Sequence, residues 1–261
     1  YRGLAAFTAD DADYFFGRDE LIQTLLDRVA AQVTADGPLV VTGPSGSGKS
    51  SLLRAGLIAG LRRSPDTEVT LLTPGHAPVG TLATRFAHLA ESRPADLRAR
   101  LEDDPAVLRS VVADAMDDRQ AVIIVDQFEE LFTACPDERQ RRIFIEALRA
   151  LCRKSADASG RSTASVARVT GSRGGTGTEA AAVVVLGVRA DFFGHCAAHE
   201  ELVPALEQPV VVGPMSPDQL RQAIEGPAQR AGLSLEDGLI ELILQDLGAD
   251  MAPDAAGGAG R

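Results

Sequence analysis

Short apolar runs alternate along this chain with segments in which apolar residues recur at helical spacing. The runs with strand character cover residues 39–42, 68–73, 120–126, 181–188 and 209–212. The helical patterns cover residues 19–35, 51–63, 79–91, 105–118, 136–154, 199–206, 217–231 and 236–247. The runs at 120–126 and 181–188 are apolar almost throughout, as expected for strands that are covered on both faces. The alternation predicts a three-layer α/β fold, in which helices cover both faces of a five-stranded parallel sheet.

Two segments lack this pattern. Residues 155–180 are rich in Ser, Gly, Thr, Ala and Arg, which predicts a disordered insertion between a helix and a strand. The stretch from Gly175 to Ala180 matches G-x-G-x-x-A, but it precedes a strand instead of following one, so we do not interpret it as a dinucleotide site. The Gly/Ala-rich tail from Ala252 to Arg261 ends without a structural stop signal, and we expect the chain to be part of a longer protein.

A complete P-loop follows the first predicted strand and precedes a helical pattern. It has the form G-x-x-x-x-G-K-[ST] and consists of Gly43, Pro44, Ser45, Gly46, Ser47, Gly48, Lys49 and Ser50. The glycines let backbone N–H groups curl around phosphate oxygens, and the helix that follows adds its partial positive charge. Lys49 is expected to reach the β- and γ-phosphates of a nucleotide, and the Ser50 hydroxyl to bind Mg²⁺.

The buried run at 120–126 ends in Asp126, about 75 residues after the P-loop. A carboxylate at the carboxyl end of a strand faces the phosphate site in this arrangement, which is known as Walker B. We therefore expect Asp126 to help hold Mg²⁺, either directly or through water.

The residue that activates the attacking water is less clearly marked. Many P-loop ATPases place Glu directly after the Walker B Asp, whereas this chain has Gln127 there. Glu129 and Glu130 are candidate bases, with a slight preference for Glu130, and Gln127 could instead orient the water and give slow turnover. An equally weighted alternative makes both glutamates solvated residues that open the next helix. Arg189 follows a strand and is expected to sense the γ-phosphate, the alternative being an ion pair with Asp191.

Two other interpretations of candidate residues are disfavoured. His195, Cys196 and His199 lie close together in sequence, but their spacing fits no closed zinc site, so we interpret them as ordinary helix residues. GTP is disfavoured because guanine is usually recognised by an Asn-containing N/T-K-x-D loop, and the sequence contains no Asn.

Composition narrows the setting in which the chain works. The formal net charge of −11 argues against non-specific binding of nucleic acid by the whole surface. No apolar run is long enough for a transmembrane helix, and the N-terminus lacks a signal-peptide pattern. The cysteines Cys135, Cys152 and Cys196 are odd in number and without C-x-x-C spacing, which indicates reduced thiols and a cytoplasmic protein.

Four segments carry a resemblance to a known family. They are Tyr1 to Phe7 followed by Phe15, Phe16, Gly17 and Arg18; Gly43 to Ser51; Val125 to Phe132, with the sequence VDQFEELF; and Gly187 to Phe193 together with Gly213 to Ser216 and Ile224 to Ala228. These segments resemble the STAND class of P-loop NTPases, specifically the bacterial novel STAND NTPase domain that is often fused to WD40 repeats. The resemblance covers residues 1–247, and VDQFEELF and VRADFFG are its most specific parts.

The resemblance implies more than the residues alone. It places Phe16, Gly17 and Arg18 near the nucleotide base, adds Ser51 to the P-loop, and implies an ASCE-type sheet with the Arg189 strand between those of the P-loop and Asp126. It implies a switch that is ADP-bound at rest and ATP-bound when signalling, with WD40 repeats or other flanking domains as partners. A homo-oligomer in the ATP state is a further partner prediction, and no membrane or direct nucleic-acid contact is expected of this domain.

The resemblance also divides the chain. We expect an N-terminal lead-in segment and helix with the hhGR motif at 1–38, the P-loop NTPase core at 39–232, and the beginning of a helical lid region with a flexible tail at 233–261. The long insertion at 155–180 and the nearly absent helical region after Gly248 depart from the family pattern.

The leading hypothesis is an ATP-binding signalling module that hydrolyses ATP slowly, with ATP or ADP and Mg²⁺ as its ligands. A P-loop kinase that phosphorylates a small molecule is the first alternative. A scaffold that binds nucleotide without catalysis is the second.

Overall fold

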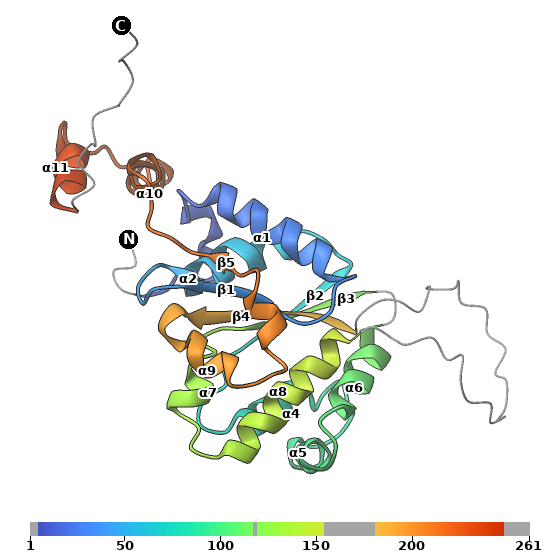
Figure 1. The fold of residues 1–261 in the computed structure, drawn as a ribbon. Helices are drawn as coiled ribbons and strands as arrows, with labels where there is room; N and C mark the ends of the chain where they lie inside the picture. The colour runs from blue at the N-terminus through green and yellow to red at the C-terminus, as the bar shows by residue number, and fades with distance from the viewer. Residues whose placement is uncertain (1–4, 117–118, 154–180, 248–261) are drawn as a thin grey trace, which may run out of the picture.

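The sheet has five strands, all parallel, in the order β2-β3-β4-β1-β5 (Figure 1). Its strands are β1 (Leu39–Gly43), β2 (Thr67–Leu72), β3 (Gln120–Val125), β4 (Ala182–Arg189) and β5 (Val210–Val211). The computed structural model describes residues 5–116, 119–153 and 181–247. Because β4 lies between β1 and β3, both the predicted α/β class and the predicted place of the Arg189 strand are confirmed.

Helices cover both faces of this sheet (Figure 1). One face carries α1 (Asp19–Gln32) and a continuous helical run made of α2 (Lys49–Ser51), the π-helix η2 (Leu52–Ile58) and α3 (Ala59–Leu61). The other face carries α4 (Pro78–Phe86), α5 (Pro94–Asp103), α6 (Val107–Met116) and α8 (Glu138–Cys152). Short helices occupy the connections: η1 (Ala9–Tyr14), α7 (Glu130–Thr133), η3 (Ala190–Phe192), α9 (Phe193–Ala197) and η4 (Val203–Leu206). The last pair, α10 (Pro217–Arg230) and α11 (Leu239–Asp246), packs together outside the three layers.

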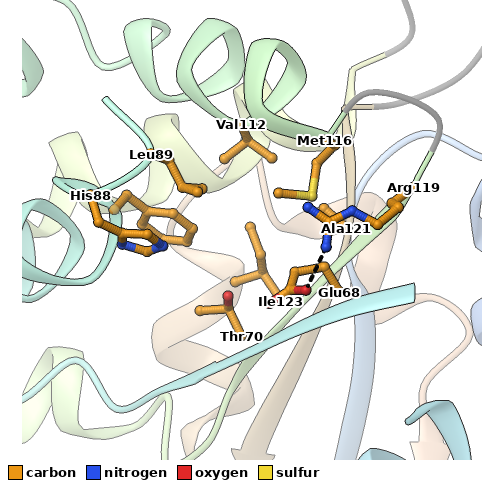
Figure 2. Close-up of a pocket in the computed structure, with 10 residues that line it drawn as sticks. Glu68, Thr70, His88, Leu89, Val112, Met116, Arg119, Ala121 and Ile123 are labelled. Atoms are coloured by element: carbon orange, nitrogen blue, oxygen red, sulfur yellow. Dashed lines mark hydrogen bonds and ion pairs between the residues drawn. The ribbon is translucent and has the colours of Figure 1, made fainter. Parts of the chain in front are cut away.

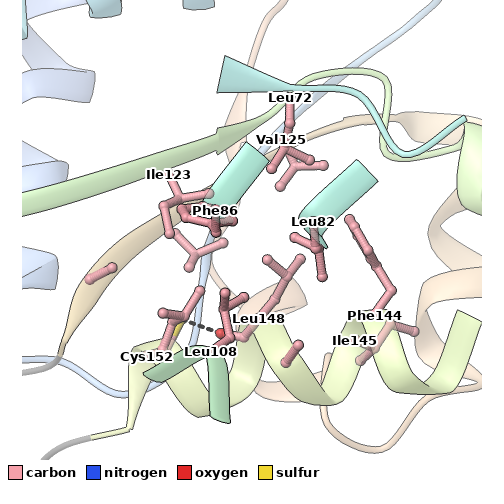
Figure 3. Packing of buried hydrophobic residues seen from close by; sticks show 14 of the residues in the cluster. Leu72, Leu82, Phe86, Leu108, Ile123, Val125, Phe144, Ile145, Leu148 and Cys152 are labelled. Carbon is pink, nitrogen blue, oxygen red and sulfur yellow. Dashed lines mark hydrogen bonds between the residues drawn. The ribbon is translucent and has the colours of Figure 1, made fainter. Parts of the chain in front are cut away.

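Successive residues of the central strands enter two separate hydrophobic cores. Ile124 of β3 packs in the core beneath α1 and η2 with Leu57. Ile123, its neighbour, packs in the opposite core with Phe86 of α4 and Phe144 of α8 (Figure 3). Both faces of β3 are therefore buried, and complete burial of one such side chain stabilises the fold by about 1.5–3 kcal/mol. This explains why the run at 120–126 is apolar without alternation.

Local capping fixes where two of the helices begin. The carboxylate of Asp137 accepts hydrogen bonds from the backbone N–H groups of Arg139 (2.9 Å) and Gln140 (3.3 Å), so α8 begins at Glu138, two residues after the start of the predicted range. Ser216 and Gln219 form a reciprocal capping box at the start of α10. The second box matters for the site because it sets the path of the chain that leaves β5 beside the P-loop.

Some elements differ from the prediction. Helix α5 was missed because its apolar stripe is narrow: only Leu97 and Leu101 are buried, in an otherwise charged segment. The helix expected at 199–206 is wrong in extent, since α9 ends at Ala197 and the later residues form turns and the 3₁₀ helix η4. The apolar run at 209–212 gives a strand of only two residues, because β5 is an edge strand that pairs with β1 alone.

Three predictions fall on residues outside the described ranges. They concern the insertion at 155–180 with its G-x-G-x-x-A match, the first four residues of the lead-in segment, and the tail after Leu247. The proposed domain boundaries at 38 and 232 stay predictions. Among the helices of the described residues, none combines the length and apolar character that crossing a membrane requires.

Candidate functional site

The P-loop, the end of β3 and the end of β4 meet at the carboxyl edge of the sheet. Together with the chain from Ala5 to Phe7 they enclose a cleft of about 400 Å³. Its walls are formed by Ala5, Ala6, Phe7, Ser45, Gly46, Gly48, Lys49, Ser50, Ser51, Asp126, Gln127, Glu129 and Arg189. The predicted residues Gly43, Pro44 and Ser47 belong to the loop without lining the cleft. Ligands of open α/β sheets bind at this edge.

The P-loop backbone has the shape that its glycines allow. Gly46 and Gly48 adopt positive φ angles of 77° and 87°, a conformation that other residues rarely take. Lys49 begins α2, and its Nζ donates to the carbonyl oxygens of Gly43 (2.9 Å) and Pro44 (2.8 Å). Burial lowers the pKa of the Lys49 ammonium, and the nearby carboxylate of Glu129 is the strongest influence in the opposite direction. The ammonium therefore lies inside the cleft beside a carboxylate.

Asp126 is the most deeply buried charged residue of the site, at 1% exposure. Its Oδ1 accepts hydrogen bonds from Ser50 Oγ (2.9 Å) and from the backbone N–H of Gln127 (3.0 Å). Its Oδ2 accepts from Arg54 Nε at 3.0 Å and lies 2.8 Å from Arg54 Nη2. Sequence analysis named Ser50 and Asp126 as separate magnesium ligands, and it missed Arg54. The signal for Arg54 was its place four residues after Ser50, which puts both side chains on one helix face.

The predicted metal ligands fit a magnesium ion. They offer a hydroxyl and a carboxylate oxygen, which are the hard ligands that Mg²⁺ prefers. The two oxygens already lie within hydrogen-bonding distance of each other, at the edge of the cleft that also holds Lys49.

The three candidate residues after Asp126 have different surroundings. Gln127 is exposed, lines the cleft and has a positive φ of 55°, which is uncommon for a residue other than glycine. Glu129 also lines the cleft, and its Oε2 accepts a hydrogen bond from the backbone N–H of Arg189 at 3.3 Å. Glu130 opens α7 and is not among the residues that line the cleft. The geometry thus favours Glu129 over Glu130 and agrees with the expectation that this segment opens a helix.

Arg189 combines both of its predicted environments. It lines the cleft, and its guanidinium also bonds the carboxylate of Asp191, with Nε–Oδ1 and Nη2–Oδ2 distances of 3.1 and 2.6 Å. Its Cζ lies 5.4 Å from the centre of the Phe192 ring. The hydrogen bond with Asp191 raises the pKa of Arg189 and lowers that of Asp191. The ion pair therefore holds the arginine at the rim of the cleft.

The hhGR motif lies behind the P-loop. Arg18 is 7% exposed, and its Nη2 donates to the carbonyl oxygens of Gly213 (2.8 Å) and Ser47 (3.5 Å). Burial lowers the pKa of Arg18. Gly17 packs against α10, where a Cβ would lie 2.3 Å from the carbonyl oxygen of Gln219. None of Phe16, Gly17 and Arg18 lines the cleft. Arg18 links the P-loop to the segment after β5, and Phe16 and Gly17 pack against α10.

The lead-in chain closes one side of the cleft. The Ser51 hydroxyl accepts a hydrogen bond from the backbone N–H of Phe7 at 3.1 Å. The Phe7 ring packs 5.7 Å from that of Phe15, measured between ring centres. Ser51 therefore anchors the segment before η1 to the P-loop helix, and this bond brings Ala5, Ala6 and Phe7 to the cleft.

Two residues of the sequence cluster that fits no closed zinc site, His195 and His199, pack against the ring of Phe132. His195 and His199 lie 5.6 and 5.8 Å from Phe132, measured between ring centres. Cys196 between them is buried, and burial raises the pKa of its thiol to about 12.

A smaller cavity of about 210 Å³ lies at the opposite end of the strands, between the β2–β3 surface and the helices α4 and α6 (Figure 2). Val112 and Met116 of α6 and Ile123 of β3 give it an apolar lining on opposite sides. An ion pair between Arg119 and Glu68, 3.1 Å apart, lies beside it. The cavity begins near the amino ends of β2 and β3, so it is separate from the P-loop cleft.

A three-layer α/β fold with a parallel central sheet, a P-loop after β1 and a buried carboxylate after β3 defines the P-loop NTPase class. Within that class, the family described as Novel STAND NTPase 1 matches residues 1–256, and the chain belongs to it. The chain is therefore a nucleotide-binding NTPase module. No curated protein sequence matches it significantly.

Of two similar solved structures, both at low sequence identity, the first shows the same fold. The chain is similar to Drosophila ORC bound to DNA, with 15% identity and a TM-score of 0.53 over 94% of this chain and 57% of that one. It is also similar to AMPPCP-bound DnaA from Aquifex aeolicus, with 15% identity and a TM-score of 0.45 over 94% of this chain and 62% of that one. The chain thus spans less than two thirds of either protein, and the likeness concerns the fold.

Proposed function

We propose that this module binds ATP and ADP with Mg²⁺, hydrolyses ATP slowly, and acts as a nucleotide-dependent switch within a larger protein. The observation that carries the proposal is the contact between Ser50 and Asp126, 2.9 Å apart, in the cleft that also holds Lys49. The contact joins a hydroxyl and a carboxylate, and the Lys49 ammonium lines the same cleft. Phosphoryl transfer requires these three groups together.

In this proposal the P-loop holds the phosphates. Its backbone N–H groups and the Lys49 ammonium compensate the negative charge of the β- and γ-phosphates. Lys49 exchanges its carbonyl partners, Gly43 and Pro44, for phosphate oxygens when nucleotide binds. Charge-assisted hydrogen bonds to phosphate are stronger than those to neutral carbonyls, which favours the exchange.

Ser50 and Asp126 would hold the magnesium ion. When bound, the ion would neutralise charge on the phosphates and orient them. The protein keeps these two oxygen ligands in place. Asp126 is held by hydrogen bonds to both of its carboxylate oxygens.

Glu129 is the proposed base, in preference to Glu130, because it is the glutamate of this segment that lines the cleft. It would accept a proton from the attacking water, with Gln127 helping to orient that water. Arg189 is the proposed γ-phosphate sensor, held at the cleft by Asp191. The backbone N–H of Arg189 donates a hydrogen bond to Glu129, which connects the proposed base to the proposed sensor. In this proposal, loss of the γ-phosphate changes the position of both residues at the end of β4.

The switch role rests on the family resemblance. We propose that the ADP form is the resting state and the ATP form the signalling state, with WD40 repeats or other flanking domains as partners and a homo-oligomer in the ATP state. The module is proposed to work in the cytoplasm, without direct contact with nucleic acid.

The proposal is tested by calorimetric titration of ATP and ADP into wild-type protein and the Lys49→Ala variant. We expect the variant to lose at least about tenfold in affinity, because a phosphate-binding cation is removed. Arg62→Ala is the matched control, since Arg62 is exposed at the end of the same helical run. Unchanged affinity in Lys49→Ala would remove the basis of the proposal.

Slow hydrolysis is tested separately. A multiple-turnover rate above about 10 s⁻¹, the median for enzymes, contradicts a switch of this kind. ATP that stays intact during long incubation with Mg²⁺ would favour the scaffold alternative, and phosphate transfer to a small acceptor would favour a kinase.

A further inference from the structure

Both oxygens of the Asp126 carboxylate accept hydrogen bonds from neighbouring groups. Ser50 Oγ and the backbone N–H of Gln127 donate to Oδ1, and the guanidinium of Arg54 contacts Oδ2. The Asp126 side chain is 2% exposed, whereas that of Arg54 is 30% exposed. Arg54 thus reaches inward from a partly open position and contacts the oxygen that faces away from Ser50.

A carboxylate with so little exposure needs charge compensation within the protein. The guanidinium of Arg54 supplies it at a distance of 2.8 Å. The two cations that line the cleft have other direct partners: Lys49 donates to the carbonyl oxygens of Gly43 and Pro44, and Arg189 pairs with Asp191. In the described part of the chain, Arg54 is the cation that forms an ion pair with Asp126.

The helix that carries Arg54 is held firmly. Arg54 lies in the π-helix η2, and π-helical turns are frequent at functional sites. At Gly56, two residues further on, a Cβ would lie 2.8 Å from Ile22 of α1, so the two helices pack in close contact. Ser50 and Arg54 are four residues apart on this run, so a single rigid element contacts both oxygens of Asp126.

We propose that Arg54 is a positioning residue that compensates the charge of Asp126 and orients its Oδ1 toward Ser50 before nucleotide and Mg²⁺ bind, and that it thereby sets how strongly nucleotide affinity depends on Mg²⁺. The inference rests on the proposed function of the cleft. It adds a role for a residue that neither the P-loop pattern nor the Walker B pattern includes.

The electrostatic consequence has a definite direction. Without Arg54, the uncompensated Asp126 carboxylate repels the phosphates of metal-free nucleotide. A divalent ion restores the compensation, so affinity in the presence of Mg²⁺ changes much less. Removal of Arg54 should therefore widen the gap between affinities measured with and without the metal.

The experiment compares ADP affinity in EDTA with ADP affinity in excess Mg²⁺, using calorimetry or a fluorescent ADP analogue. In Arg54→Gln we expect the ratio of the two dissociation constants to exceed the wild-type ratio by about tenfold, as expected when one charge is removed beside the site. Arg54→Lys keeps the charge and should bring the ratio back toward wild type. Arg62→Gln, on the same helical run, should leave it unchanged.

The outcomes separate the inference from the proposed function. Equal weakening of ADP binding in both buffers would show that Arg54 has only a structural role and would overturn the inference. An unchanged ratio in Arg54→Gln would overturn it as well. Wild-type protein that binds ADP in neither buffer would instead overturn the proposed function.

A second variant covers the case in which Arg54→Gln does not fold. The double variant Arg54→Gln/Asp126→Asn replaces the ion pair by two neutral amides. It should fold, because the buried carboxylate that needs compensation is gone, and it should show little dependence of ADP affinity on Mg²⁺. A double variant that also fails to fold would contradict the role of Arg54 in charge compensation.

Discussion

The backbone N–H of Arg189 donates a hydrogen bond to Glu129 Oε2 over 3.3 Å, which joins the end of β4 to the turn after β3. The bond holds the Glu129 carboxylate in the cleft, where it also acts on the ammonium of Lys49. The neighbouring Glu130 is the first residue of helix α7 and does not line the cleft. Two adjacent glutamates thus have different surroundings: Glu129 lines the cleft, and Glu130 begins a helix.

The first prediction distinguishes these two glutamates. Glu129→Gln should lower the single-turnover rate of ATP hydrolysis by about 10²–10⁴-fold, the range typical for loss of a general base. Glu130→Gln is the matched control and should stay within about threefold of wild type. Rates are measured with radiolabelled ATP at saturating protein. A larger loss in Glu130→Gln would instead support Glu130 as the base, as sequence analysis slightly preferred.

The second prediction concerns Gln127, the exposed residue that follows Asp126. Replacement by Glu places a carboxylate where many P-loop ATPases have one, beside the proposed water position. Gln127→Glu should therefore raise the steady-state rate of hydrolysis by roughly tenfold. Unchanged ADP affinity is the control for the fold of the site. A rate that stays at or below that of wild type would show that Gln127 does not limit turnover.

The third prediction concerns the contact between Phe16 and Gly226 of α10. A Cβ at position 226 would lie 2.4–2.7 Å from atoms of the Phe16 ring. Gly226→Ala should therefore lower the free energy of unfolding by about 1–3 kcal/mol, the usual cost of overpacking, although Ala is the better helix former. The measurement is urea denaturation.

Two further variants test the cause of that loss. Gly194→Ala is a control, since a Cβ at position 194 has no atom within 4 Å, and it should be neutral or slightly stabilising. In a double-mutant cycle, Phe16→Leu should recover part of the loss in Gly226→Ala. Additive effects of the two substitutions would rule out the proposed clash.

The fourth prediction concerns the buried thiols. Burial raises the pKa of Cys152 and of Cys196 to about 12, from a usual value of 9.0. A raised pKa keeps the thiol neutral to higher pH, and only the thiolate reacts with alkylating agents. Both residues should therefore resist iodoacetamide at pH 8 in the native protein and react when it is denatured, as mass spectrometry of peptides would show. Rapid alkylation of the native protein at either position would contradict the described burial.

The sequence was sufficient wherever the signal is local. The P-loop residues are contiguous, and their chemistry follows from glycine conformations and one ammonium. The strands that end at Asp126 and Arg189 are buried on both faces, which produces uninterrupted apolar runs. The strand at 209–212 was predicted, although the paired part is only Val210–Val211. The charged helix α5 was missed, because it buries too little apolar surface to leave a clear period.

Contacts between distant segments could not be obtained in this way. Arg54 and Asp126 are 72 residues apart, and the local signal, the place of Arg54 four residues after Ser50, does not by itself identify Asp126 as its partner. The contacts of Arg18 with the carbonyl oxygens of Ser47 and Gly213 likewise join distant segments, and its place near the nucleotide base stays a prediction.

The sequence by itself determined the class of the protein, the strands and the residues that hold phosphate and metal in our proposal, because these depend on backbone conformation and on short patterns. The tertiary structure decided which glutamate enters the cleft and which arginine compensates Asp126. Those choices depend on how strands and helices pack. The turn between β3 and α7 includes Gln127 with a φ of 55°, and it precedes the separation of Glu129 in the cleft from Glu130 in the helix.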